Sequence, residues 1–153
     1  QKEMKKFFEG SCLPTVVDDT IPLSEFLEAG KVDEKYYYRE DKYMYDELVK
    51  DMTNPNTVYQ WRRKYVRENK SGVCPTLTAN MGTGGHNVPL ILVEDGIRKL
   101  TPRECFNLQG FPDSYKLPND VANTQLYKQA GNSVTVSLVE KLGKGIRETL
   151  EHF

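Results

Sequence analysis

The sequence is poor in cysteine: Cys12, Cys74 and Cys105 are the only three in a chain of 153 residues. Because their number is odd and no two lie close together, they argue against the disulfide framework that supports many small secreted domains. With His86 they have no metal-ligand spacing, so we expect no metal site. A reducing, cytoplasmic compartment is therefore expected.

Long hydrophobic runs and internal repeats are also missing. Since a membrane-spanning helix needs roughly 20 apolar residues in succession, we expect neither a membrane partner nor a signal peptide. The 153 residues are enough for one domain with a modest core. The chain begins with Gln1 rather than Met, which we expect of a piece of a longer polypeptide.

The chain has almost no net charge, formally −1 at pH 7, but its charges are unevenly distributed. Residues 1–58 carry 8 basic and 13 acidic side chains, whereas residues 59–70 carry 5 basic and 1 acidic. Residues 71–153 carry 8 of each sign. The local field of the short basic segment therefore says more about partners than the overall charge does.

The basic segment, residues 59–70, combines arginines with aromatic residues and amides. Arginine forks read guanine edges in the major groove and also neutralise phosphates. A solvated charged face is the plainer alternative. The threonine- and glycine-rich stretch 76–87 favours DNA binding, because hydroxyls form hydrogen bonds and glycines let backbone amides approach a phosphate. The candidate DNA-binding residues are Arg62, Arg63, Arg67, Thr76, Thr78, Asn80, Gly84 and Gly85.

The first two thirds of the chain contain signals for short elements. Short helices are expected over 22–30 and 40–51. Residues 88–93 have the pattern of a strand, and Asp95-Gly96 is a two-residue hairpin turn. A cluster of tyrosines is expected to pack against neighbouring elements, with stacking on nucleic acid as the alternative. These residues are Tyr36, Tyr37, Tyr38, Tyr43 and Tyr45.

Two helices are predicted near the C-terminal end. Thr101 begins the first with a capping box that Glu104 completes. Apolar residues recur every four positions over 133–150, which predicts a final helix with one apolar stripe that needs a partner surface. On local chemistry alone, residues 131–134 are a turn with a helix N-cap.

Two segments in this region form a specific pattern: residues 98–105, RKLTPREC, and residues 125–134, QLYKQAGNSV. In this order and at this distance they resemble the last two sequence blocks of the DNA cytosine-5 methyltransferases, especially those of bacterial type II restriction-modification systems. The resemblance implies an α+β fold. A small, irregular, β-rich target-recognition domain would be followed by a C-terminal helix that packs on the α/β methyltransferase domain.

The resemblance also implies a division of the chain. Residues 1–22 would be a connector and residues 23–116 the target-recognition domain. Residues 117–153 would complete the catalytic and cofactor domain. The S-adenosylmethionine pocket would be lined by Asn132, Ser133 and Val134, and the structural ties would be Arg98, Arg103 and Glu104.

Blocks that such enzymes need for catalysis are missing from these residues. The sequence has no Pro-Cys nucleophile and no Glu-Asn-Val block, and Cys74-Pro75 has the reverse order. The resemblance thus implies no catalytic residue here and no turnover by the chain alone. The expected partners are double-stranded DNA, with a GGCC-like target, and a missing N-terminal catalytic domain or separate catalytic subunit. The whole enzyme would work in the bacterial cytoplasm, protecting DNA from a cognate restriction enzyme.

Two alternatives remain open on the sequence. A non-enzymatic, sequence-specific DNA-binding module would not need the chemistry of residues 125–134. An interaction domain with no role on DNA would show no affinity that falls steeply with salt.

Overall fold

The computed structural model describes residues 21–42 and 44–151, and they belong to two units. The first unit, residues 20–133, contains a β-sheet with helices and has the predicted α+β character. The described part of the second unit, residues 134–151, contains one helix, α5 (Val136–Leu150). The predicted connector, residues 1–22, lies almost wholly outside the described residues.

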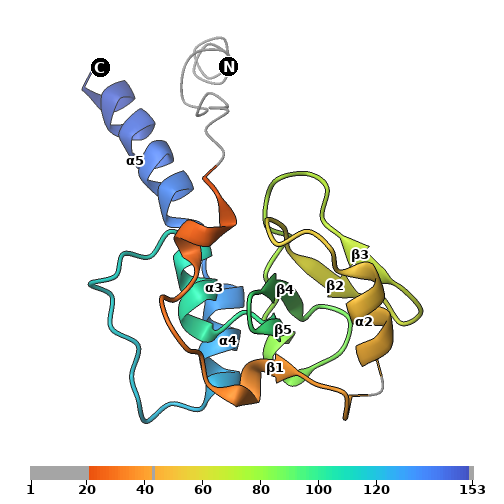
Figure 1. Cartoon of the computed structure of the whole chain (residues 1–153). Helices are drawn as coiled ribbons and strands as arrows, with labels where there is room; N and C mark the ends of the chain where they lie inside the picture. The colour runs from red at the N-terminus through yellow and green to blue at the C-terminus, as the bar shows by residue number, and fades with distance from the viewer. Residues whose placement is uncertain (1–20, 43, 152–153) are drawn as a thin grey trace. The chain divides into compact units, whose positions relative to one another are not determined.

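The first unit is built around a five-stranded antiparallel sheet in the order β1-β5-β4-β2-β3 (Figure 1). The strands are β1 (Tyr37–Tyr38), β2 (Tyr59–Trp61), β3 (Val66–Glu68), β4 (Pro89–Val93) and β5 (Gly96–Lys99). The predicted strand at 88–93 is confirmed. The hairpin turn is displaced by one residue, to Glu94 and Asp95, because Gly96 pairs with Val93 as the first residue of the return strand.

The sheet is covered on both faces. Alternate residues of a strand point to opposite sides, so neighbouring residues of β4 belong to different core clusters. Ile91 belongs to a core cluster with residues of the helices α3 (Pro102–Leu108) and α4 (Asn123–Asn132). Its neighbour Leu90 belongs to a second cluster, with residues of α2 (Tyr45–Asp51). The sheet is therefore a middle layer between α2 and the pair α3 and α4.

Three short 3₁₀ helices complete the described elements: η1 (Leu23–Phe26), η2 (Glu34–Tyr36) and η3 (Met81–Thr83). The predicted helix at 40–51 is confirmed in its second half by α2. Tyr36 and Tyr37 are buried in the core, as the packing interpretation predicted. Tyr43 lies outside the described residues.

The capping box at the start of α3 is confirmed. Thr101 Oγ1 accepts a hydrogen bond from the Glu104 N–H at 3.2 Å, and Glu104 Oε2 accepts one from the Thr101 N–H at 2.8 Å. Pro102, whose missing N–H would have had no helical partner, is the first helical residue.

The prediction that the final helix begins near Ser133 is wrong, and α4 was not predicted at all. Ser133 has an extended backbone and ends α4, so α5 begins only at Val136. In α4 the buried residues are Leu126, Tyr127 and Ala130. Three apolar residues among polar neighbours form a stripe too narrow to predict a helix from the sequence. Packing on the core, rather than the composition of the helix, stabilises it. The compact unit continues past residue 116, although the functional boundary proposed there stays a prediction.

Candidate nucleic-acid interface

An open cleft of about 490 Å³ lies beside the edge of the sheet in the first unit. One side comes from β2, β3 and the residues next to them, including Gln60, Arg62 and Arg67. The other side comes from the loop that contains Thr76 and Thr78. The cleft thus brings together residues of the basic segment and residues of the threonine-rich stretch, which sequence reasoning had linked only by their chemistry.

The cleft has a positive character. None of the described residues that line it carries a carboxylate, while Arg62 and Arg67 contribute two guanidinium groups. The turn between β2 and β3 is tight: the Arg62 N–H donates to the Tyr65 carbonyl at 2.8 Å, and Arg63 adopts a left-handed φ of 60°. An anion with hydrogen-bonding edges, such as DNA, fits a cleft of this composition.

Four candidate DNA-binding residues do not line the cleft: Arg63, Asn80, Gly84 and Gly85. Arg63 Nε donates a hydrogen bond of 3.0 Å to His86 Nε2, which ties the β2–β3 turn to the glycine-rich loop. Asn80 Oδ1 accepts from Thr78 Oγ1 at 2.8 Å and so orients a cleft residue. Gly84 and Gly85 have positive φ, and both are exposed.

Cys74 also lines the cleft, but its environment suppresses thiolate chemistry. Burial in apolar surroundings raises the pKa of the Cys74 thiol to about 12. Because the thiolate is the reactive form of cysteine, this thiol is a poor nucleophile near neutral pH. Cys74 therefore lines the cleft without serving as a nucleophile there.

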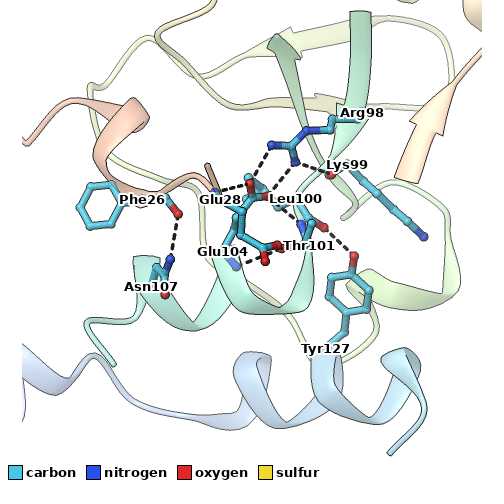
Figure 2. A network of polar contacts seen from close by, with 9 residues as sticks. All are labelled: Phe26, Glu28, Arg98, Lys99, Leu100, Thr101, Glu104, Asn107 and Tyr127. Carbon is cyan, nitrogen blue, oxygen red and sulfur yellow. Dashed lines mark hydrogen bonds and ion pairs between the residues drawn. The ribbon is translucent and has the colours of Figure 1, made fainter. Parts of the chain in front are cut away.

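Two of the three residues predicted as structural ties, Arg98 and Glu104, lie in a buried polar network (Figure 2). The Arg98 guanidinium donates two hydrogen bonds of 2.7 Å to the carboxylate of Glu104, and the two side chains are 3% and 0% exposed. Burial opposes the charged form of Arg98, but hydrogen bonds to Glu104 and attraction by its charge outweigh burial and raise the Arg98 pKa. The pair joins β5 to α3.

Glu28 is part of this network and was missed in the sequence. Its N–H donates to Glu104 Oε1 at 3.0 Å, and its carboxylate accepts a 2.5 Å hydrogen bond from Thr101 Oγ1. Nothing in the local sequence signals a partner more than seventy residues away. Arg103, the third predicted tie, is half-buried in α3, where it donates to Asn107 Oδ1 at 2.8 Å and to the Tyr115 carbonyl at 2.6 Å.

The three residues predicted for the cofactor pocket lie at the end of α4 and just beyond it. Asn132 is exposed, and Val134, the first residue of the second unit, is 65% exposed. Ser133 Oγ donates to the Ala130 carbonyl at 2.7 Å. The N-cap of α5 is Thr135, without a side-chain cap, so the expectation that Asn132 or Ser133 caps that helix is wrong.

Family comparison identifies this arrangement. The family model of the C-5 cytosine-specific DNA methylases matches residues 16–148. The chain belongs to this family. Among curated relatives, it is 56% identical over 139 residues to the type II methyltransferase M.Bsp6I of Bacillus sp. (strain RFL6), a match that covers 90% of the chain and 42% of that protein.

More distant relatives agree. The type II methyltransferase M.NgoBI of Neisseria gonorrhoeae is 33% identical over 86% of the chain and 39% of its own length. The S. pombe Dnmt2 methyltransferase shares the fold, with a TM-score of 0.65 at 19% identity over 98% of the chain and 47% of that structure. The chain thus spans less than half the length of these proteins, and the alternative of a non-enzymatic DNA-binding module is not favoured.

Two negative findings concern only the described part of the chain. No helix there is long and apolar enough to cross a membrane. No group of three or more His, Cys, Asp or Glu side chains there could hold a metal ion.

Proposed function

We propose that this chain is the target-recognition and C-terminal portion of a DNA cytosine-5 methyltransferase of a bacterial restriction-modification system. It binds a short double-stranded DNA site through the arginine- and threonine-lined cleft. The whole enzyme transfers a methyl group to C5 of a cytosine and protects the DNA from a cognate restriction enzyme, which places it with that DNA in the bacterial cytoplasm. The cleft carries the proposal, because it unites Arg62, Arg67, Thr76 and Thr78 in a chain of this family.

The last residue of α4 and the two residues after it supply one wall of the S-adenosylmethionine pocket in this proposal. The exposed Asn132 amide has no hydrogen-bond partner among the described residues, so it is available to a ligand carboxylate or hydroxyl. The Ser133 hydroxyl donates inward to Ala130 and offers only its lone pairs. Val134 presents an exposed apolar side chain. This set fits the polar and apolar parts of the cofactor, which supplies the methyl group when bound.

The DNA-binding part of the proposal is tested with the chain itself. Duplexes bound from a randomised pool are sequenced, and their affinity is measured against salt concentration. Enrichment of one short site, with affinity that falls steeply with salt, is expected of phosphate contacts combined with base contacts. Affinity that is absent or independent of salt contradicts the proposal.

The partner part of the proposal requires the remaining half of the enzyme. The amino-terminal half of M.Bsp6I, a relative that this chain matches over 42% of its length, is mixed with the chain, and transfer of labelled methyl groups to DNA is measured. Activity in the mixture and in neither half alone is expected. Asn132→Ala in the mixture should raise the KM for S-adenosylmethionine more than the KM for DNA.

A further inference from the structure

The end of α4 touches the backbone of the loop that lines the cleft. A Cβ atom built on Gly131 would lie within 3.0 Å of the Thr78 carbonyl carbon and oxygen and of the Ala79 nitrogen. Real Cβ atoms essentially never approach other atoms this closely. Glycine therefore allows a backbone-to-backbone contact between α4 and residues 78–79.

This contact opposes the local preference of the helix. Glycine inside a helix is less favourable than alanine by about 1 kcal/mol, so helix formation alone would select against Gly131. The atoms that an alanine would meet belong to a peptide group rather than to the end of a flexible side chain. A side chain at this position consequently has to displace either α4 or the loop.

A second close contact joins the same two segments, this time with the glycine in η3 and the contacted residue in α4. A Cβ atom on Gly82, in η3, would lie within 3.0 Å of the Tyr127 ring and Cβ. Gly131 and Gly82 thus hold residues 78–83 against α4 at two points. The loop and η3 are placed by the helix on which they rest.

α4 itself is fixed from the other side. The Tyr127 hydroxyl, which is buried, donates a 2.5 Å hydrogen bond to the Leu100 carbonyl (Figure 2). The Gln109 side-chain amide, at the end of α3, donates to the Ala130 carbonyl at 3.2 Å. Because α4 is tied to the core at both Tyr127 and Ala130, a clash at Gly131 is relieved more easily by shifting the half-buried Thr78–Ala79 peptide than by moving the helix.

We propose that Gly131 is a positioning residue that sets the Thr76–Thr78 side of the cleft from the end of α4. Gly131 directly precedes Asn132 and Ser133, which are assigned to the cofactor. The contact of Gly131 with Thr78 and Ala79 therefore places the loop assigned to DNA next to residues assigned to the cofactor. This inference rests on the proposed function for its consequence on DNA, but the contact itself can be tested without DNA.

The experiment compares Gly131→Ala with Gly143→Ala in the whole chain. Gly143 is a suitable control, because it also lies in a helix and a Cβ there would have no neighbour within 4 Å. Amide chemical shifts are recorded for both variants. Affinity is measured for a short duplex containing GGCC and for the duplex enriched from the randomised pool.

Gly131→Ala should shift the amide signals of residues 76–80 and weaken DNA binding at least about tenfold, the loss expected of two misplaced hydrogen bonds. The salt dependence should stay unchanged, since Arg62 and Arg67 are not displaced. A merely structural defect would instead shift signals throughout the unit. Gly143→Ala should leave residues 76–80 and the affinity unaltered.

Unchanged loop signals and unchanged affinity in Gly131→Ala overturn the inference. If the wild-type chain binds no DNA but the loop signals move as expected, the positioning role stands and the proposed function fails. If Gly131→Ala does not fold, as circular dichroism will show, Tyr127→Phe replaces it. Loss of that single hydroxyl should shift the loop signals, and signals that move only around Leu100 count against the inference.

Discussion

If the cleft binds DNA as proposed, its single side chains should make separable contributions to affinity. Arg67 has no carboxylate partner among the described residues and lines the cleft, so its charge is available to a phosphate or a guanine. Arg67→Ala should weaken binding and, if it contacts a phosphate, reduce the slope of log affinity against log salt by about 0.9. Fluorescence anisotropy at several salt concentrations measures both.

A matched control for Arg67 is Lys50→Ala, which removes the same charge from an exposed position in α2. Lys50 does not line the cleft. Equal losses in the two variants would mean that only the net charge matters, and would contradict a specific role for Arg67.

Glu104 is the residue on which the buried network depends. Its two oxygens accept hydrogen bonds from Arg98, from the Thr101 N–H and from the Glu28 N–H. In Glu104→Gln, the new NH₂ group would face a donor, and Arg98 would remain charged and buried. We expect a loss of about 3 kcal/mol in the free energy of unfolding. Urea denaturation measures it, with the exposed Glu47→Gln in α2 as a control that should change little.

The half-buried Cys74 thiol and the buried Cys105 thiol give a pH-dependent prediction. Burial raises the pKa of Cys74 to about 12 and that of Cys105 well above its usual range. Both thiols stay protonated in the folded chain, whereas in the unfolded chain they ionise at about pH 8.5. Stability from these groups is therefore complete below about pH 8.5 and falls as the pH rises above it.

Alkylation shows the same effect directly. At pH 8, Cys74 and Cys105 should react with iodoacetamide at least about a hundredfold more slowly in the folded chain than in urea, as mapped by peptide mass. Fast labelling of Cys74 in the folded chain would show that its thiolate is accessible, and would reopen its exclusion as a nucleophile.

At the scale of elements, the exposed apolar face of α5 is the most consequential feature. No residue of this helix is buried, and Leu138 and Ile146 are 49% and 52% exposed. Apolar stripes of this kind bury against another surface when one is offered. The chain alone should therefore self-associate as its concentration rises, as sedimentation velocity would show.

The double variant Leu138→Glu and Ile146→Glu should remain monomeric under the same conditions. Lys144→Glu, in the same helix but off the apolar stripe, should associate as the wild-type chain does. A wild-type chain that is monomeric at all concentrations would contradict this use of the face.

The elements that the sequence predicted are those with strong local signals. The capping box at Thr101 and the strand at 88–93 depend on residues close together in the chain, so both can be predicted from the sequence. α4 was missed because three buried residues on one face stabilise it through the core rather than through its own composition. The displaced turn at Glu94 and Asp95 reflects pairing of Gly96 with Val93, which only the sheet decides.

The sequence indicates the groups of the candidate site but not their arrangement in space. The hydrogen-bonding groups of Arg62, Arg67, Thr76 and Thr78 suggest contact with DNA, which stays a prediction, and the structure adds that these residues share one cleft. The contact of Gly131 with the Thr78–Ala79 peptide could not be foreseen, because glycine in a sequence does not reveal what approaches it.

At the scale of the whole molecule, the cleft proposed to bind DNA lies in a chain whose sequence has no Pro-Cys pair. None of its three cysteines follows a proline, and Cys74, which lines the cleft, has a pKa raised to about 12 and so stays protonated near neutral pH. Covalent attack on a cytosine ring requires a thiolate placed against an extruded base. We therefore expect no methyl transfer by the chain alone, even though we propose that it binds DNA.

Transfer of tritiated methyl groups from S-adenosylmethionine to DNA tests this expectation, with a full-length relative such as M.HhaI of Haemophilus parahaemolyticus as the positive control. The Cys74→Ser variant makes the test specific. Any activity of the wild-type chain that disappears in Cys74→Ser would assign the nucleophile to this thiol. It would refute the proposal that the catalytic nucleophile lies outside this chain. Activity that persists in Cys74→Ser would show that this thiol is not the nucleophile; burial also raises the pKa of the Cys105 thiol. We expect no methyl transfer by the wild-type chain or by Cys74→Ser, and activity once the complementary half is added. The cleft, the protonated thiol and the exposed Asn132 together lead to this prediction.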